Sequence, residues 1–126
     1  MSAPNDIQSR NVQTEARLWL AQRVSAMILG LAVVVHLGTI IVAVQGGLSA
    51  AEIVARIGGN PLWTAFYAVF VLAIAVHAPI GLRSILNEMT ALSPRRVDLL
   101  CFIAAAFLAV MGYRVVRDFY LIGGAA

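Results

Sequence analysis

The sequence contains no lysine and a single cysteine, and charged residues make up only 12% of its 126 positions. Hydrophobic residues make up 61%, which is too apolar for a soluble domain of this length. One cysteine excludes an intrachain disulfide and cannot supply the several thiolates of an iron–sulfur cluster. We interpret Cys101 as a buried, inert thiol. No basic patch is interleaved with aromatics, which argues against nucleic-acid binding.

Long hydrophobic runs fill most of the chain. Residues 24–44 and 62–82 contain no charged side chain, and residues 97–120 contain Asp98 near their start and arginines only toward their end. Runs of about 20 apolar residues are typical of membrane-spanning helices. The sequence therefore predicts an all-α membrane protein with three transmembrane helices. Such a three-helix domain, residues 17–122, buries little core by itself, so we expect partner helices around it.

The segments outside the runs give further predictions. Residues 1–16 form a polar N-terminal arm that we expect to be loosely ordered unless a partner holds it. Nothing in this arm has the basic-then-apolar design of a cleaved signal, so we expect the first span to stay in the mature protein. Ser49 followed by Glu52 predicts a capping box and a surface helix of about two turns, which the glycines at 58–59 would end.

All nine basic residues are arginines, and their distribution predicts the topology. With three spans, one side of the membrane carries Arg10, Arg17, Arg23, Arg83, Arg95 and Arg96, and the other carries Arg56, Arg114 and Arg117. Cytoplasmic loops carry the excess of positive charge. We therefore expect the N-terminus and the loop between the second and third spans to be cytoplasmic.

His36 and His77 are the two histidines, and both lie inside predicted spans. An ionisable side chain in a bilayer suggests a functional site: a haem or metal ligand, a proton relay, or a hydrogen bond to another helix. The first two spans contain no carboxylate, which disfavours a relay. Counting from Arg23 and Arg83 places the histidines at depths about 10 Å apart. Each would then need a partner histidine from another chain, which suits two haems at two levels of a bundle.

Small residues accompany both histidines. Ala73 and Gly81 lie four residues on either side of His77, which would let a flat ring approach the helix. A small and polar stripe on the first span contains Ser25, Ala32, His36, Thr39 and Ala43. The alternative interpretation is ordinary packing of helices through small residues.

Two segments carry a family resemblance: QRVSAMILG at 22–30 and HAPIGLRSILNEM at 77–89. They resemble the cytochrome b-type membrane anchor subunit of succinate:quinone oxidoreductases and fumarate reductases. The family pattern is roughly H-R-x-[ST]-G at the start of the first span and H-x-x-x-G-x-R-H late in the second. The resemblance covers about residues 17–120, including the three-span layout. Gln22 stands where the family often has histidine.

The resemblance implies roles for both histidines. His77 matches the axial ligand of haem b. His36 matches a deeper first-span histidine that two-haem relatives carry, so it would be a second axial ligand. The alternative for each is a packed, hydrogen-bonded histidine.

The resemblance also implies binding residues. Arg23 matches an arginine that borders the quinone pocket and the haem propionates, and Ser25 matches the hydroxyl residue that lines the same pocket. Arg83 would meet the propionates from the cytoplasmic side. Trp19 lies near a position where some relatives place a quinone-contacting serine. The alternatives are arginines that only set topology and a hydroxyl that only begins a helix.

The function implied is a membrane anchor of succinate dehydrogenase or fumarate reductase in a bacterial inner membrane. It would bind haem b, one or two per complex and shared with a partner chain, and pass electrons between an iron–sulfur subunit and quinone. Flavoprotein and iron–sulfur subunits would dock on the cytoplasmic side, and a second anchor chain or a copy of this one would complete the bundle. Two alternatives are a b-type cytochrome subunit of another oxidoreductase and a haem-free structural membrane protein.

Overall fold

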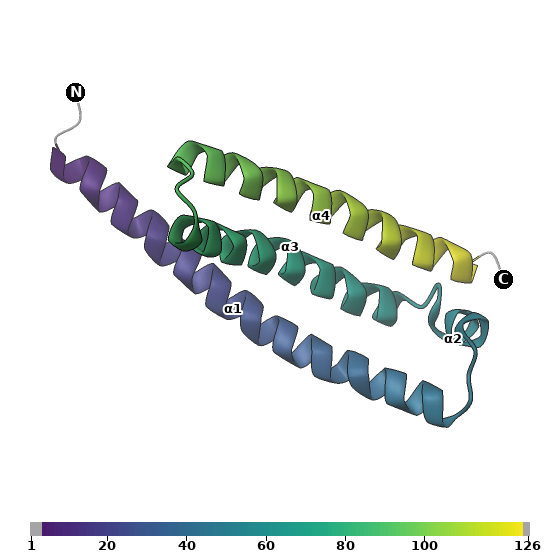
Figure 1. Ribbon diagram of the computed structural model, residues 1–126. Coiled ribbons are helices and arrows are strands. Elements are labelled where there is room, and N and C mark those ends of the chain that lie inside the picture. The colour runs from purple at the N-terminus through teal and green to yellow at the C-terminus, as the bar shows by residue number, and fades with distance from the viewer. Residues whose placement is uncertain (1–3, 125–126) are drawn as a thin grey trace.

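The computed structural model describes residues 4–124, and its elements are all helices. They are α1 (Pro4–Gln45), α2 (Ala50–Ile57), α3 (Pro61–Met89) and α4 (Pro94–Gly124). α1 and α4 run in the same direction and α3 runs in the opposite one, and α3 contacts both other long helices (Figure 1). All three long helices are apolar enough to cross a membrane. The predictions of an all-α class and three transmembrane helices are confirmed.

Local hydrogen bonds explain where the two middle helices begin. At α2, the Ser49 hydroxyl accepts from the Glu52 amide at 3.3 Å, and the Ser49 amide donates to the Glu52 carboxylate at 2.7 Å. This is the predicted capping box, and Gly58 ends the helix after eight residues. At α3, the Asn60 side chain accepts from the Leu62 amide at 2.9 Å, and Pro61 occupies the first helical position. Proline suits that position because its missing N–H has no helical partner there.

Residues 4–16, the predicted N-terminal arm, form the first turns of α1, and their loose order in the absence of a partner stays a prediction. Two polar side chains, Ser9 and Thr14, fold back onto carbonyl oxygens of the same helix. Glu15 is tied to α3 by an ion pair with Arg83. α1 continues through position 16 without a break. The predicted boundary between the arm and the membrane domain at this position therefore stays a prediction. Residues 1–3 lie outside the described range.

Small residues form the interior of the bundle. The buried positions are Ser25, Ala32 and Ala43 on α1, Ala73 and Pro79 on α3, and Val97 and Cys101 on α4. The small-residue stripe predicted on the first span therefore faces the protein, and Cys101 is buried as predicted. Most large aliphatic and aromatic side chains of the spans point outward, as they do where lipid is the solvent.

α3 and α4 lie in close contact at Gly112. A β-carbon at this position would overlap the side chain of Val71. Small residues let transmembrane helices approach closely enough for their van der Waals contacts to hold them together. Gly112 therefore sets the distance between α3 and α4.

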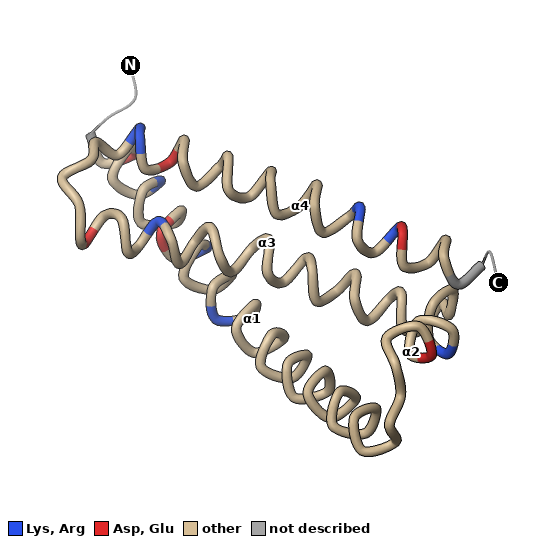
Figure 2. The backbone as a smooth tube through the Cα atoms, turned by 45° about the vertical axis from the view of Figure 1, so that its right-hand side comes forward, with Lys and Arg blue, Asp and Glu red and all other residues tan. Residues whose placement is uncertain are grey.

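Charge is concentrated at the two ends of the bundle (Figure 2). We call the end with the N-terminal half of α1 and the α3–α4 loop the basic end. The opposite end carries α2 and the last turns of α4, and we call it the α2 end. The six arginines predicted for one side of the membrane belong to the basic end, and the other three belong to the α2 end.

Candidate functional site

His77 lies where α3 packs against α1, and its ring meets a hydroxyl group. Its Nδ1 is 3.4 Å from Ser25 Oγ. The Ser25 hydroxyl donates to the Gln22 carbonyl oxygen at 3.0 Å. The donor and acceptor at this contact depend on the His77 tautomer. While the Ser25 hydroxyl donates its one proton to Gln22, Oγ can accept from His77 in the tautomer that carries its proton on Nδ1. This tautomer leaves Nε2 with a lone pair, which a metal ligand requires.

Gln22 extends this polar cluster by one turn of α1. Its amide nitrogen lies 3.3 Å from the place that a β-carbon on Gly81 would occupy, so glycine makes room for the amide. Its amide oxygen is buried and has no hydrogen-bond partner within residues 4–124. Buried acceptors normally have a donor, so this oxygen is positioned to accept from a ligand or another chain. The sequence prediction did not include Gln22 in the site. Its spacing of three residues from Ser25 could have placed it there, because residues three apart share one face of a helix.

A cavity of about 320 Å³ opens beside Ser25, between α1 and α3. Its walls are aliphatic apart from the one hydroxyl. They consist of Ala21, Val24 and Ile28 on α1 and Val69, Leu72, Ala73 and Val76 on α3. The cavity therefore offers hydrocarbon surface next to a single polar group, which is the usual composition of a small-molecule site.

Arg23 and Trp19 form a separate pair on the surface of α1. The Arg23 guanidinium carbon lies 4.9 Å from the centroid of the Trp19 ring, which is a cation–π contact. Arg23 and Ser25 are two residues apart and point about 200° apart around the helix. The structure thus brings Ser25 and His77 together and leaves Arg23 and Trp19 exposed, on a face open to lipid or another chain.

Arg83 lies at the basic end, where it connects all three long helices. Its guanidinium contacts Glu15 on α1 at 3.1 Å and Asp98 on α4 at 3.2 Å. Two carboxylates thus already accept from Arg83, the residue that the family resemblance assigns to the haem propionates. The sequence prediction missed these partners because they lie on other helices.

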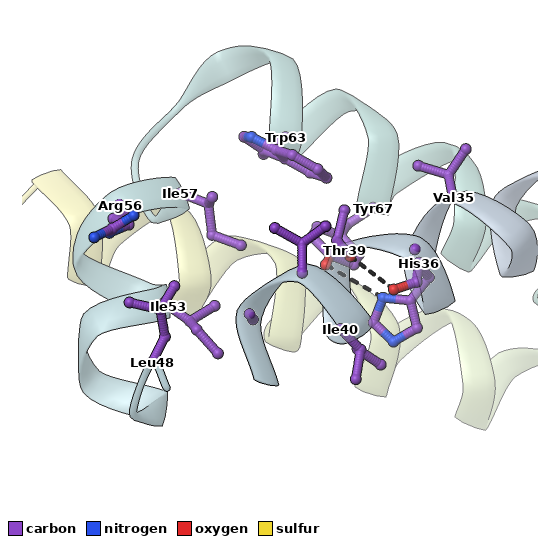
Figure 3. Close-up of a pocket in the computed structure, with 13 residues that line it drawn as sticks. Val35, His36, Thr39, Ile40, Leu48, Ile53, Arg56, Ile57, Trp63 and Tyr67 are labelled. Carbon is purple, nitrogen blue, oxygen red and sulfur yellow. Dashed lines mark hydrogen bonds between the residues drawn. The ribbon is translucent and has the colours of Figure 1, made fainter. Parts of the chain in front are cut away.

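His36 meets aromatic side chains of α3. Its Nδ1 is 3.4 Å from the Tyr67 hydroxyl, and its ring stands edge-on to the rings of Tyr67 and Phe70, each at 5.9 Å between centroids. The Thr39 hydroxyl donates to the His36 carbonyl oxygen at 2.7 Å (Figure 3). An interhelical hydrogen bond, one of the two interpretations of His36, is therefore present. A role as second axial ligand stays a prediction.

The two histidines lie farther apart in depth than counting from the arginines suggested. His77 is level with Ser25 and His36 is level with Tyr67. Eleven residues of α1, from Ser25 to His36, rise by about 16 Å. The earlier value of about 10 Å assumed that Arg23 and Arg83 share one depth, whereas the helix register places Arg23 deeper. The histidines cannot both ligate one ion.

Metal-ligating side chains do not gather elsewhere in the described chain. Over residues 4–124, no three histidine, cysteine, aspartate or glutamate side chains converge on a common point. Any metal held by this part of the chain would have to bring its other ligands, as the iron of a porphyrin does.

Comparison with known proteins agrees with this arrangement. The family described as succinate dehydrogenase/fumarate reductase transmembrane subunit matches residues 4–113. A curated relative from Archaeoglobus fulgidus, named succinate dehydrogenase hydrophobic membrane anchor subunit, is 29% identical over 86% of this chain and 92% of its own length. No solved structure matches the chain.

The chain belongs to the family of succinate dehydrogenase/fumarate reductase transmembrane subunits, because that family covers most of its length. The resemblance that the 22–30 and 77–89 segments indicated is thereby confirmed. The protein is a multi-pass membrane anchor, and the enzyme it serves is an oxidoreductase complex.

Proposed function

We propose that this anchor binds haem b through His77 Nε2 and borders a quinone site at the basic end. The observation that carries the proposal is the 3.4 Å contact between His77 Nδ1 and Ser25 Oγ. Metal-bound histidines almost always donate their other ring N–H to a neighbour, which fixes the ring and raises its basicity. Ser25 Oγ can accept a hydrogen bond from that N–H group, and Nε2 is then left for the iron.

The residues around His77 fit a porphyrin. Ala73, one turn before His77, has a small side chain, and His77 itself is only partly buried, so its ring can be reached from outside the chain. When bound, haem b supplies a one-electron iron centre. Since the described chain has its other histidine about 16 Å away in depth, we propose that a second anchor chain, or a copy of this one, supplies the opposite axial ligand.

For the propionates, Arg83 lies in the turn of α3 beyond Gly81 and already donates to two carboxylates. A propionate that reaches Arg83 takes the place of Glu15 or Asp98, because the guanidinium donates to both of them. This exchange keeps the charge paired and costs little, because both carboxylates are more than half exposed.

For quinone, we propose that Ser25 and Arg23 contribute from opposite sides of α1. Ser25 borders the 320 Å³ cavity, which suits an apolar ring or tail. Arg23 and Trp19 face outward and would complete the site only together with another chain.

The basic end is where we propose that the flavoprotein and iron–sulfur subunits dock. Six of the nine arginines belong to it, and this excess of positive charge supports a cytoplasmic location for the basic end. The polar first turns of α1, exposed from Asn5 to Arg17, project from this end. They offer a rigid polar surface to soluble subunits.

The proposal is tested by haem content in the purified complex. His77→Ala should lose haem, as measured by a reduced-minus-oxidised spectrum and haem quantitation, while the subunits still copurify. Ile85→Ala is the matched control, because Ile85 is on the same helix, is 55% exposed and lies outside the cavity beside Ser25. Unchanged haem in His77→Ala would remove His77 as a ligand, and a wild-type complex without haem would favour the alternative of a haem-free anchor.

A haem count also decides the role of His36. Two haems in the wild-type complex and one in His36→Ala would assign it as a ligand. An unchanged count would leave it with the hydrogen bond to Tyr67.

A further inference from the structure

A second cavity, of about 540 Å³, lies at the α2 end where α1, α2 and α3 meet (Figure 3). We call it the α2 cavity. Its walls include Val35 and Val42 on α1, Leu48 in the loop, Ile53 and Ile57 on α2, and Trp63 on α3. Its position, opposite the basic end and beside the first turn of α3, separates it from the site around His77.

The polar side chains at the inner end of this cavity satisfy one another. Tyr67 and His36 lie within hydrogen-bond distance, and the Thr39 hydroxyl donates to the His36 carbonyl oxygen. A bound molecule with polar ring substituents could form hydrogen bonds with these side chains only by breaking the hydrogen bonds that they already make. The cavity therefore favours an occupant whose inserted part is hydrocarbon.

Arg56 supplies a charge at the edge of the cavity. It lies on α2 and takes part in none of the three ion pairs formed among residues 4–124. The nearest carboxylate along the helix, that of Glu52, is engaged by the Ser49 amide at 2.7 Å and the Ser49 hydroxyl at 2.8 Å. The guanidinium is thus available to an anion.

The orientation of α2 matches the membrane surface. Ile53 and Ile57 turn toward the cavity, while Glu52 and Arg56 are exposed. A helix of this kind, placed between two spans, lies at the level of the lipid headgroups. An arginine at this level attracts anionic headgroups, and a guanidinium pairs with phosphate oxygens through two parallel hydrogen bonds.

We propose that the α2 cavity binds an anionic phospholipid, with an acyl chain inside the cavity and the headgroup phosphate on Arg56. The volume lies within the usual range of ligand sites, about 300–1,000 Å³. The charge on Arg56 selects an anionic over a zwitterionic lipid of the same chain length. The site ties α2 to the ends of α1 and α3 at the membrane surface.

The test uses the purified complex, stripped of loosely held lipid by detergent washing and then titrated with phosphatidylglycerol or with phosphatidylcholine of the same acyl chains. Retained lipid is counted by mass spectrometry. The wild-type complex should retain phosphatidylglycerol more tightly. Arg56→Gln should weaken that retention about tenfold and remove the preference.

Gly38→Leu tests the cavity itself. Gly38 lines it, and a β-carbon there meets nothing within 4 Å, so a leucine side chain at this position starts in open space at the cavity wall. This variant should lose the retained phospholipid. Gly30→Leu is the matched control, because Gly30 is on the same helix, is equally open and lies outside the cavity. Arg114→Gln is the control for charge at the same end.

Each other result overturns the proposal. Equal retention of both lipids by the wild type removes the role of Arg56. Loss of a quinone or a haem, rather than phospholipid, in Gly38→Leu identifies a different occupant. Equal losses in Gly30→Leu or Arg114→Gln show that lipid binds the outer surface rather than the cavity. Copurification of the partner subunits confirms that each variant is folded.

Discussion

Ser25 Oγ and His77 Nδ1 lie 3.4 Å apart across the interface of α1 and α3, although 52 residues separate them in the chain. This contact joins the two sequence segments that carry the family resemblance. Ser25 is 4% exposed, so its hydroxyl belongs to the protein interior rather than to the membrane surface. The motif hydroxyl therefore has a physical role that sequence alone did not assign: it orients the imidazole.

Removing that hydroxyl should weaken haem binding without abolishing it. We expect Ser25→Ala to lower haem affinity about 10- to 100-fold, because the histidine loses the partner that holds its ring. Haem titration of the purified complex measures this. Ser25→Thr keeps the hydroxyl and should restore most of the affinity, and equal affinity in Ser25→Ala and wild type would remove Ser25 from the site.

Gly112→Ala should push α3 and α4 apart. The added methyl overlaps Val71, and overpacking of this kind costs about 1–3 kcal/mol. We expect a lower temperature of complex dissociation in detergent. Gly30→Ala adds the same methyl on α1 where nothing lies within 4 Å, so it should behave as wild type. Equal behaviour of the two variants would contradict the close approach of α3 and α4.

Reversing the charge of Arg83 should destabilise the protein more than removing either one of its two carboxylate partners. Glu15 and Asp98 are 61% and 62% exposed, so Glu15→Gln or Asp98→Asn alone should change stability by only about 0.2–1 kcal/mol. Arg83→Glu places a third negative charge beside them and should reduce the yield of assembled complex. Adding Glu15→Arg to that variant should recover yield, and no recovery would contradict the pairing across α1 and α3.

Glu52 should titrate below the usual range of a glutamate. The Ser49 amide, then the Ser49 hydroxyl and the charge on Arg56, lower the pKa of this carboxyl. A lowered pKa means that the capping stabilisation is present above the pKa of an unfolded glutamate and is lost as pH falls through the folded value. NMR of labelled Glu52 measures the midpoint. Ser49→Ala should raise it, and an identical midpoint in both proteins would refute the capping contribution.

The spans and the α2 capping box could be predicted because they depend on local composition and on residues three positions apart. The contact between Glu15 and Arg83 could not, since it joins residues 68 positions apart on two helices. The outward direction of Arg23 follows from helix register once Ser25 is known to be buried. The Tyr67 partner of His36 lies on α3, and no local pattern identifies it.

The most direct test of the account is a density map of the intact complex around His77. We predict a planar macrocycle whose iron is bonded to His77 Nε2, while Nδ1 is hydrogen-bonded to Ser25 Oγ. Lipid tails or side chains alone beside the Nε2 atom would contradict the central claim.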